Sequence, residues 1–169
     1  MPKLSFRRTI AGWLLPVLLG LISFVTVGIY PQPAIADDFT KATLGNQDFS
    51  GKDLTSYEFT QASVRGGKFV NTDMTGVSLI GGDFDSADFS GANMTNTALD
   101  TTRLTRTNLT NVIFVGAFVT NTNFNGATID GADFTDVLLR KDVQKLLCKM
   151  AKGTNPKTGR VTRETLECP

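Results

Sequence analysis

The chain has 169 residues, 41% of them hydrophobic and 9% aromatic, which is enough for one domain with a packed core and too apolar for a disordered tail. Its 17 basic and 16 acidic side chains give a formal charge of +1, which argues against a strongly basic nucleic-acid-binding protein. With no histidine and only two cysteines, it lacks the residues for His-dependent catalysis, for most zinc sites and for a disulfide-dense scaffold.

Residues 1–36 predict an export signal. The first ten residues carry three basic side chains and no acidic one, an apolar run covers 11–29, and the small-residue motif Ala34-Ile35-Ala36 follows. This arrangement is typical of a secretory signal peptide cleaved between Ala36 and Asp37. The mature domain is therefore expected outside the cytosol.

Two alternatives stay open for this segment. The adjacent Arg7 and Arg8 permit twin-arginine export as well as the general route. The apolar run is also about as long as the ~20 residues of a membrane span, so an uncleaved anchor is the competing interpretation, and the only membrane contact expected. Pro16, Pro31 and Pro33 favour a signal.

Charge divides the remaining residues into two parts. Residues 37–136 hold 6 basic and 13 acidic groups, a net charge of −7, whereas residues 137–169 hold 8 basic and 3 acidic groups, a net charge of +5. Such a change predicts a boundary near Asp136.

Apolar residues recur at every fifth position over most of this region, and nine of the twelve phenylalanines lie on that register. The apolar positions are Phe39, Leu44, Phe49, Leu54, Phe59, Val64, Phe69, Met74, Leu79, Phe84, Phe89, Met94, Leu99, Leu104, Leu109, Phe114, Val119, Phe124, Ile129, Phe134 and Leu139. A period of five fits neither the 3.6 of a helix nor the 2 of a strand, so the backbone must turn within every repeat.

The positions around each apolar centre agree with this interpretation. Two residues before the centre the side chain is Ala, Gly, Thr or Val in 17 of 21 cases, small enough to point inward. Two residues after it, 13 of 21 are Gly or Asn, which tolerate the backbone of a tight corner. The other flanking residues are mostly polar and are expected to face water.

At this point the chain resembles the pentapeptide-repeat family, whose pattern is present in Ala87-Asp88-Phe89-Ser90-Gly91 and Ala132-Asp133-Phe134-Thr135-Asp136. The resemblance covers residue 37 to about residue 141. It implies an all-β solenoid, a right-handed quadrilateral β-helix in which four repeats make one coil, with about five coils. Residues 20 apart would then stack, so that Phe49, Phe69 and Phe89 form one ladder.

A helical pattern begins where the repeats stop. The apolar residues Leu139, Val143, Leu146, Leu147 and Met150 have the spacing of one buried helix face, and Gly153 is expected to end the helix. We therefore predict three parts: an export signal at 1–36, a β-helix at 37–138, and a C-terminal α-helical cap at 139–169 that covers the last strand edge.

Cys148 and Cys168 are the only thiols of an exported chain, so a disulfide between them is the expected pairing. The tail that contains them is similar to the ending of pentapeptide-repeat proteins of the cyanobacterial periplasm or lumen and the chloroplast thylakoid lumen. That similarity implies a lumenal or periplasmic location and no catalytic residues.

Other chemistry finds little support in the sequence. The acidic run Gly81-Gly82-Asp83-Phe84-Asp85 superficially resembles a calcium β-roll, but it supplies too few oxygens and both carboxylates are expected in solvent. The family includes acidic mimics of duplex DNA, a role that the export signal and scattered basic residues oppose here. We therefore predict no enzymatic activity, no bound metal or cofactor, and no nucleic-acid partner.

Two surface features are candidates for binding a protein partner. Ile113, Val115, Phe118 and Leu138 are apolar at outward positions, and Lys141, Lys145, Lys149 and Lys152 form a basic stripe opposite the apolar face of the helix. The sequence thus favours a non-enzymatic interaction or scaffold module whose partner it does not identify. The alternatives are that the tail covers the apolar patch while the lysines are merely solvated, and that the Cys148–Cys168 disulfide makes the protein a redox-responsive regulator.

Overall fold

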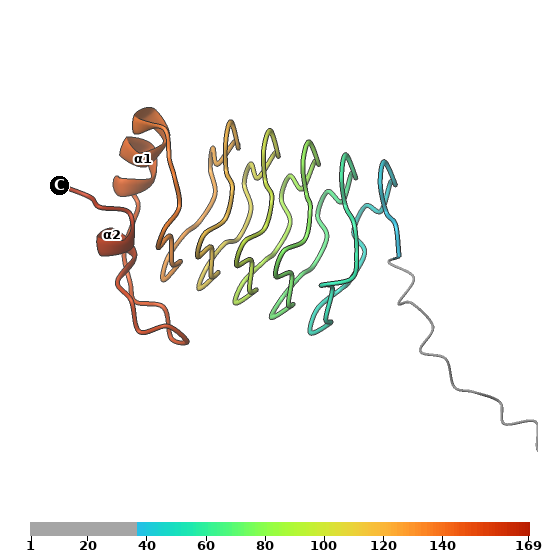
Figure 1. Ribbon diagram of the computed structural model, residues 1–169, viewed down its shortest axis with the longest axis horizontal. Coiled ribbons are helices and arrows are strands. Elements are labelled where there is room, and N and C mark those ends of the chain that lie inside the picture. Colours follow the sequence, from blue (N-terminus) through green and yellow to red (C-terminus); the bar gives the residue numbers. More distant parts are fainter. Residues whose placement is uncertain (1–36) are drawn as a thin grey trace, which may run out of the picture. The chain divides into compact units, whose positions relative to one another are not determined.

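The computed structural model describes residues 37–169, which form a column of stacked coils followed by a tail with two short helices (Figure 1). Helix α1 spans Lys141–Cys148 and helix α2 spans Thr162–Thr165. The export signal predicted for residues 1–36 lies outside the described residues. Within 37–169, neither helix has the length and apolarity that crossing a membrane requires.

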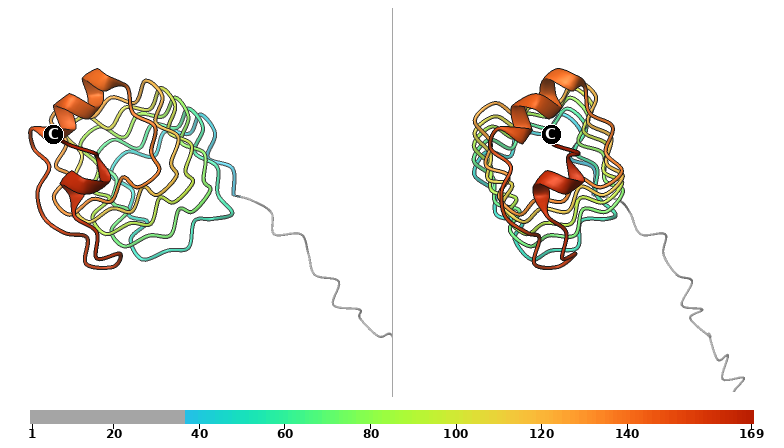
Figure 2. Two further views of the ribbon diagram at one scale, coloured as in Figure 1. Left: turned by 60° about the vertical axis from the view of Figure 1, so that its left-hand side comes forward. Right: turned by 90° about the vertical axis from the view of Figure 1, so that its left-hand side faces the viewer.

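The coils are joined by parallel bridges between residues 20 apart, from Asp38 with Glu58 to Ile113 with Asp133. Each bridge lies one residue before an apolar centre, and backbone hydrogen bonds flank it. In a typical repeat the N–H of Phe89 donates to the carbonyl of Asn108 over 2.8 Å. Four repeats therefore make one turn of the backbone, and successive turns lie side by side along the column (Figure 2).

The chain turns a corner after every apolar centre. In a typical corner the N–H of Ala87 donates to the carbonyl of Phe84 over 3.0 Å, and the intervening Ser86 has φ 60°. A positive φ occurs at every equivalent position from Lys41 to Asp136 except Ser56, which is the signature of a type II turn. This backbone explains the preference for Gly and Asn two residues after each centre.

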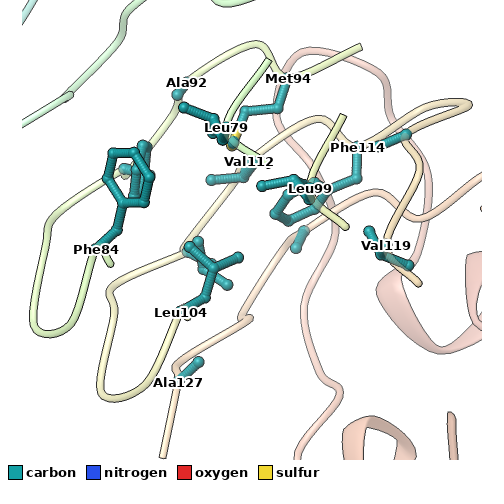
Figure 3. Packing of buried hydrophobic residues seen from close by; sticks show 14 of the residues in the cluster. Leu79, Phe84, Ala92, Met94, Leu99, Leu104, Val112, Phe114, Val119 and Ala127 are labelled. Atoms are coloured by element: carbon teal, nitrogen blue, oxygen red, sulfur yellow. The ribbon is translucent and has the colours of Figure 1, made fainter. Parts of the chain in front are cut away.

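The apolar centres fill the interior in stacked ladders. The rings of Phe49 and Phe69 lie 5.1 Å apart and those of Phe69 and Phe89 lie 4.6 Å apart, nearly parallel in both pairs. The predicted phenylalanine ladder is confirmed. In a close view of the core, Leu79 and Leu99 are part of another ladder (Figure 3).

Threonines at the inward positions beside the centres are buried but keep a hydrogen-bond partner. The hydroxyl of Thr97 donates to the carbonyl of Met74 over 3.0 Å, and that of Thr102 donates to the carbonyl of Leu79 over 2.7 Å. Each hydroxyl thus reaches a backbone oxygen in the preceding coil. Thr fits this position because a buried hydroxyl is costly only when it has no partner.

The coil ladder stops before the last apolar centre of the sequence. Its final bonds reach Asp133 and Thr135, the latter by an N–H to O distance of 3.0 Å from Gly116. Leu139 continues the period of five in the sequence but joins no bridge among the described residues and is half-buried. The chain leaves the coil geometry here to begin α1.

Helix α1 is shorter than the apolar pattern predicts: it ends at Cys148, and the prediction that it continues to Gly153 is wrong. The N–H groups of Lys149 and Met150 bond to carbonyls three residues back, which tightens the last turn. The tail then crosses the last coil, where the N–H of Gly131 donates to the carbonyl of Lys152 over 2.8 Å. A longer straight helix would carry Lys152 away from this contact.

Candidate functional site

Phe118 and Leu138 are the two most exposed large apolar side chains among the described residues, at 61% and 91% exposed. The sequence period places both on the same side of the column, one residue before an apolar centre. Phe118 is bridged to Ala98 in the preceding coil, and Ile80, 38% exposed, lies on that side as well. This side therefore carries an apolar strip, which we call the Phe118 face.

The other two apolar candidates belong to a neighbouring side of the column. Ile113 is bridged to Asn93 and to Asp133, and both Ile113 and Val115 are half-buried. Val115 precedes the corner at Gly116 that leads to Phe118. The four residues thus do not form one patch: Ile113 and Val115 lie around the corner from Phe118, and Leu138 follows the last bridged coil and lies among residues of the tail.

The lysine stripe predicted for the tail is exposed along its length. Lys141 and Lys145 lie in α1, Lys149 follows it, and all three project into solvent. The ammonium of Lys152 is 3.2 Å from a carboxylate oxygen of Asp130 in the last coil, so this lysine makes an ion pair with the coil. Exposed pairs of this kind contribute little to stability, typically ~0–1 kcal/mol.

Asp85 corrects the expectation that the carboxylates of the acidic corner lie in solvent, because it is 3% exposed. Its carboxylate accepts hydrogen bonds from the Thr105 hydroxyl and from the guanidinium groups of Arg106 and Arg65, the last over 3.1 Å. The sequence register placed Asp85 outward, but these three side chains from adjacent coils cover it.

The surroundings of Asp85 favour its ionised form. The hydrogen bond from Thr105 is the main cause that lowers the pKa of this carboxyl; burial opposes it, and the charges of Arg106 and Arg65 add to the lowering. Asp85 therefore forms ion pairs with two arginines and binds one coil to its neighbours. Among residues 37–169 no group of three or more His, Cys, Asp or Glu side chains is arranged to hold a metal ion.

The disulfide joins the end of α1 to the end of the chain, with the Cys148 and Cys168 sulfurs 2.01 Å apart. Arg163 spans the same region: its guanidinium donates to the carbonyl of Cys148 and to the main-chain oxygen of Pro169, each over 2.9 Å. The pairing predicted from the sequence is present, and its effect is to close the tail into a loop that contains α2.

Asn155 is a structural residue that the sequence did not reveal, because the pair Asn155-Pro156 indicates only a turn. Its side chain is fully buried, and its amide nitrogen donates to the carbonyls of Asn111 and Gly131 over 3.1 and 2.9 Å. Its side-chain oxygen accepts the N–H of Lys157 over 2.9 Å. One amide group therefore holds the tail against the last two coils.

Comparison with known proteins identifies the repeat. The family of pentapeptide repeats matches in eight copies, over residues 38–76, 58–96, 68–106 and 102–140. These segments cover most of the coil region and more than half of the chain.

Two curated relatives come from the thylakoid lumen of Arabidopsis thaliana chloroplasts. The chain is 57% identical over 42 residues to thylakoid lumenal 15 kDa protein 1, and 50% identical over 42 residues to thylakoid lumenal protein TL20.3. Each match covers 25% of this chain but only 19% and 15% of the respective relatives. The chain thus aligns with less than a fifth of the length of either relative.

A solved structure provides a longer comparison. The crystal structure of a pentapeptide repeat protein from the Arabidopsis thaliana thylakoid lumen superposes with a TM-score of 0.63 at 38% sequence identity. The match covers 79% of this chain and 87% of that one. The likeness identifies the column of coils as a right-handed quadrilateral β-helix.

Proposed function

The chain belongs to the pentapeptide-repeat family, and from that premise we propose that it is a non-enzymatic interaction or scaffold module that binds a partner protein through the outer faces of its β-helix. The family of repeats supports an interaction role. The Phe118 face is the observation on which this proposal depends most.

The finer architecture is part of the proposal. We assign about five coils to residues 37–138 and an α-helical cap to residues 139–169. The repeated bridges between residues 20 apart support the coil count, and the contacts of Lys152 and Asn155 with the last two coils support the cap. A cap of this kind protects part of a strand edge from pairing with other chains.

We place the mature protein in the thylakoid lumen, with the periplasm as the alternative, after cleavage of the export signal between Ala36 and Asp37. The signal pattern of residues 1–36 and the lumenal origin of the relatives support this location. Mass measurement of the protein recovered from its compartment tests the cleavage site, because a mature chain must begin at Asp37.

The Phe118 face is suited to a partner because it departs from the polar surface of most other outward positions. Exposed apolar side chains gathered on one face are typical of protein-binding surfaces. The exposed Lys141, Lys145 and Lys149 in the adjoining tail supply a basic rim. Burying a side chain such as Phe118 contributes ~1.5–3 kcal/mol to binding before its entropic costs.

Affinity capture from the native compartment tests this function. The bait is the mature protein, and its matched control is a variant with Phe118→Ser and Leu138→Ser, which leaves the buried core unchanged. We expect a partner that the unchanged bait retains and the variant loses. Equal retention by both baits would overturn the role of the Phe118 face, and the absence of any retained protein would contradict the interaction role.

The redox-responsive regulator remains the alternative function, but no contact among the described residues favours it over a structural disulfide. The disulfide lies between a buried Cys148 and a half-buried Cys168, beside the hydrogen bonds of Arg163. A partner retained only by the reduced or only by the oxidised form, at equal folded fraction, would favour the regulator.

A further inference from the structure

The last coil has an edge that the tail leaves partly open. In the coil before it, the N–H groups of Leu104 and Arg106 donate to the carbonyls of Asn123 and Asn125 over 2.9 and 3.0 Å. The equivalent N–H groups of the last coil belong to Phe124 and Gly126, and neither makes a hydrogen bond within residues 37–169.

The carbonyl of Thr122 completes this open edge. One coil earlier, the carbonyl of Thr102 accepts the N–H of Asn123 over 2.9 Å, whereas the carbonyl of Thr122 accepts no N–H within the described part of the chain. The edge therefore presents one acceptor, the carbonyl of Thr122, and two donors, the N–H groups of Phe124 and Gly126. Their order along the chain is the one by which each coil bonds to the next. An extended segment can continue the ladder here by strand addition.

A groove runs beside this edge. It has a volume of about 250 Å³ and is lined by residues 121–125 on one side and by Arg140, Asp142, Val143 and Leu146 on the other. Val143 and Leu146 belong to the apolar face of α1 and are half-buried. Helix α1 thus packs on the core through Val143 and also gives the groove an apolar wall opposite the unpaired backbone groups.

The tail limits the length of a segment that can pair with this edge. Farther along the same edge, Gly131 and Phe134 are already bonded to the tail through Lys152 and Thr165. A whole coil of a second copy cannot pair along the full edge while the tail occupies these positions. A short extended segment meets no such obstacle, because it needs only the stretch from Thr122 to Gly126.

The charged residues around the groove indicate which charge a bound segment should carry. Residues 137–169 carry a net charge of +5, and Lys141 and Lys145 are exposed on α1, the helix that supplies one wall of the groove. The only carboxylate that lines the groove among the described residues, Asp142, is 2.9 Å from the guanidinium of Arg140 and is neutralised by it. The surroundings therefore favour an acidic segment.

We propose that the groove between α1 and the last coil binds an extended segment of a partner protein in which one apolar residue is flanked by acidic residues. The backbone of that segment pairs with Thr122, Phe124 and Gly126. Its apolar side chain packs against Val143 and Leu146, because the ring of Phe124 is already covered. This site rests on the proposed interaction function and names the class of ligand.

The test uses a blocked peptide of sequence GEDFDEG, added to the isotope-labelled processed protein and followed by amide NMR and hydrogen exchange. We expect the amides of Phe124 and Gly126 to shift and to exchange more slowly, while those of Leu104 and Arg106 do not change. The peptide GEDGDEG, which lacks the apolar side chain, should bind at least ~10-fold more weakly, because burial of a Phe side chain is lost.

Two variants distinguish the contribution of the groove to peptide binding from that of the net charge of the tail. Val143→Glu places a carboxylate in the groove and should weaken binding at least ~10-fold by steric and like-charge effects. Lys145→Gln makes the same change in net charge on the exposed side of α1 and should weaken binding only ~2-fold. The amide spectrum of each variant shows whether it is folded.

Several outcomes would overturn the site. They are no binding of GEDFDEG, equal binding by Val143→Glu, or binding without a change at Phe124 and Gly126. A shift of these amides with protein concentration alone would assign the groove to a second copy of this chain. If a natural partner depends on the Phe118 face but is retained by Val143→Glu, this inference fails and the interaction function stands.

Discussion

The coils and the tail of this protein are held together in different ways. In the coils, each repeat makes the same backbone bonds to the next coil, and its apolar centre stacks on a centre 20 residues away, as Phe69 does on Phe89. The tail is held in place by contacts that each occur once: one disulfide, the amide of Asn155 and the guanidinium of Arg163.

This difference determines where damage should spread. A fault in the core of one coil disturbs the coils above and below, because neighbouring coils bury each other. A fault in the tail removes one attachment and leaves the stacked coils intact.

The largest effect is expected from Phe89→Asp. The change places a carboxylate in the middle of a ladder whose aromatic neighbour lies 4.6 Å away, which costs several kcal/mol and should abolish folding. Asp88→Ala is the matched control, since Asp88 is half-buried and accepts only the N–H of Ser90 over 2.9 Å, and it should cost at most ~1 kcal/mol. Thermal unfolding followed by circular dichroism compares them, and equal effects would show that the register is wrong.

Removal of the disulfide should have a smaller effect. The double variant Cys148→Ser and Cys168→Ser opens a loop of sequence separation 20, for which chain entropy predicts a loss of ~3 kcal/mol. Urea unfolding measures the change, and amide exchange should show that the tail is loosened while the coils keep their protection. Loss of protection throughout the coils would contradict the division between coils and tail.

Asn155→Ala should cost ~2 kcal/mol, because it removes several buried hydrogen bonds of one side chain. The loosening should concentrate in residues 153–161 and appear in hydrogen exchange. Lys149→Ala, an exposed change in the same tail, is the control and should alter stability by no more than ~0.5 kcal/mol. If Lys149→Ala were as damaging as Asn155→Ala, the attachment would lie elsewhere.

The smallest effect is a pH dependence from Asp85. Because the folded protein lowers the pKa of this carboxyl below its ordinary value of 3.8, its contribution to stability is present above that value and is lost as the pH falls toward the folded pKa. The melting temperature of the unchanged protein should therefore fall more between pH 6 and pH 3 than that of Asp85→Asn. Asp100→Asn, which removes a carboxyl outside the ion pairs of the described residues, should keep the full fall.

The sequence predicts the coils well because every repeat needs the same two features, an apolar centre and a corner residue that tolerates positive φ. An apolar centre such as Phe89 is recognised by its register, and a corner residue such as Gly91 by its tolerance of positive φ, here 69°. The sequence did not reveal the burial of Asp85, because that burial depends on arginines from the coils on either side. A position-by-position pattern does not contain that geometry.

The tail was predicted less well for the same reason. Its helix and disulfide were recognised from local spacing and from the count of cysteines. The end of α1 at Cys148 and the buried amide of Asn155 depend on how the tail meets the last coil. Contacts that occur once leave no period in the sequence.

Amide hydrogen exchange on the processed protein tests the central contrast most directly, because it compares equivalent groups one coil apart. We predict strong protection of Leu104 and Arg106, whose N–H groups bond to the next coil, and fast exchange of Phe124 and Gly126, whose N–H groups find no partner within residues 37–169. Equal protection of the two pairs would contradict this prediction, since the regular ladder would then continue into the tail.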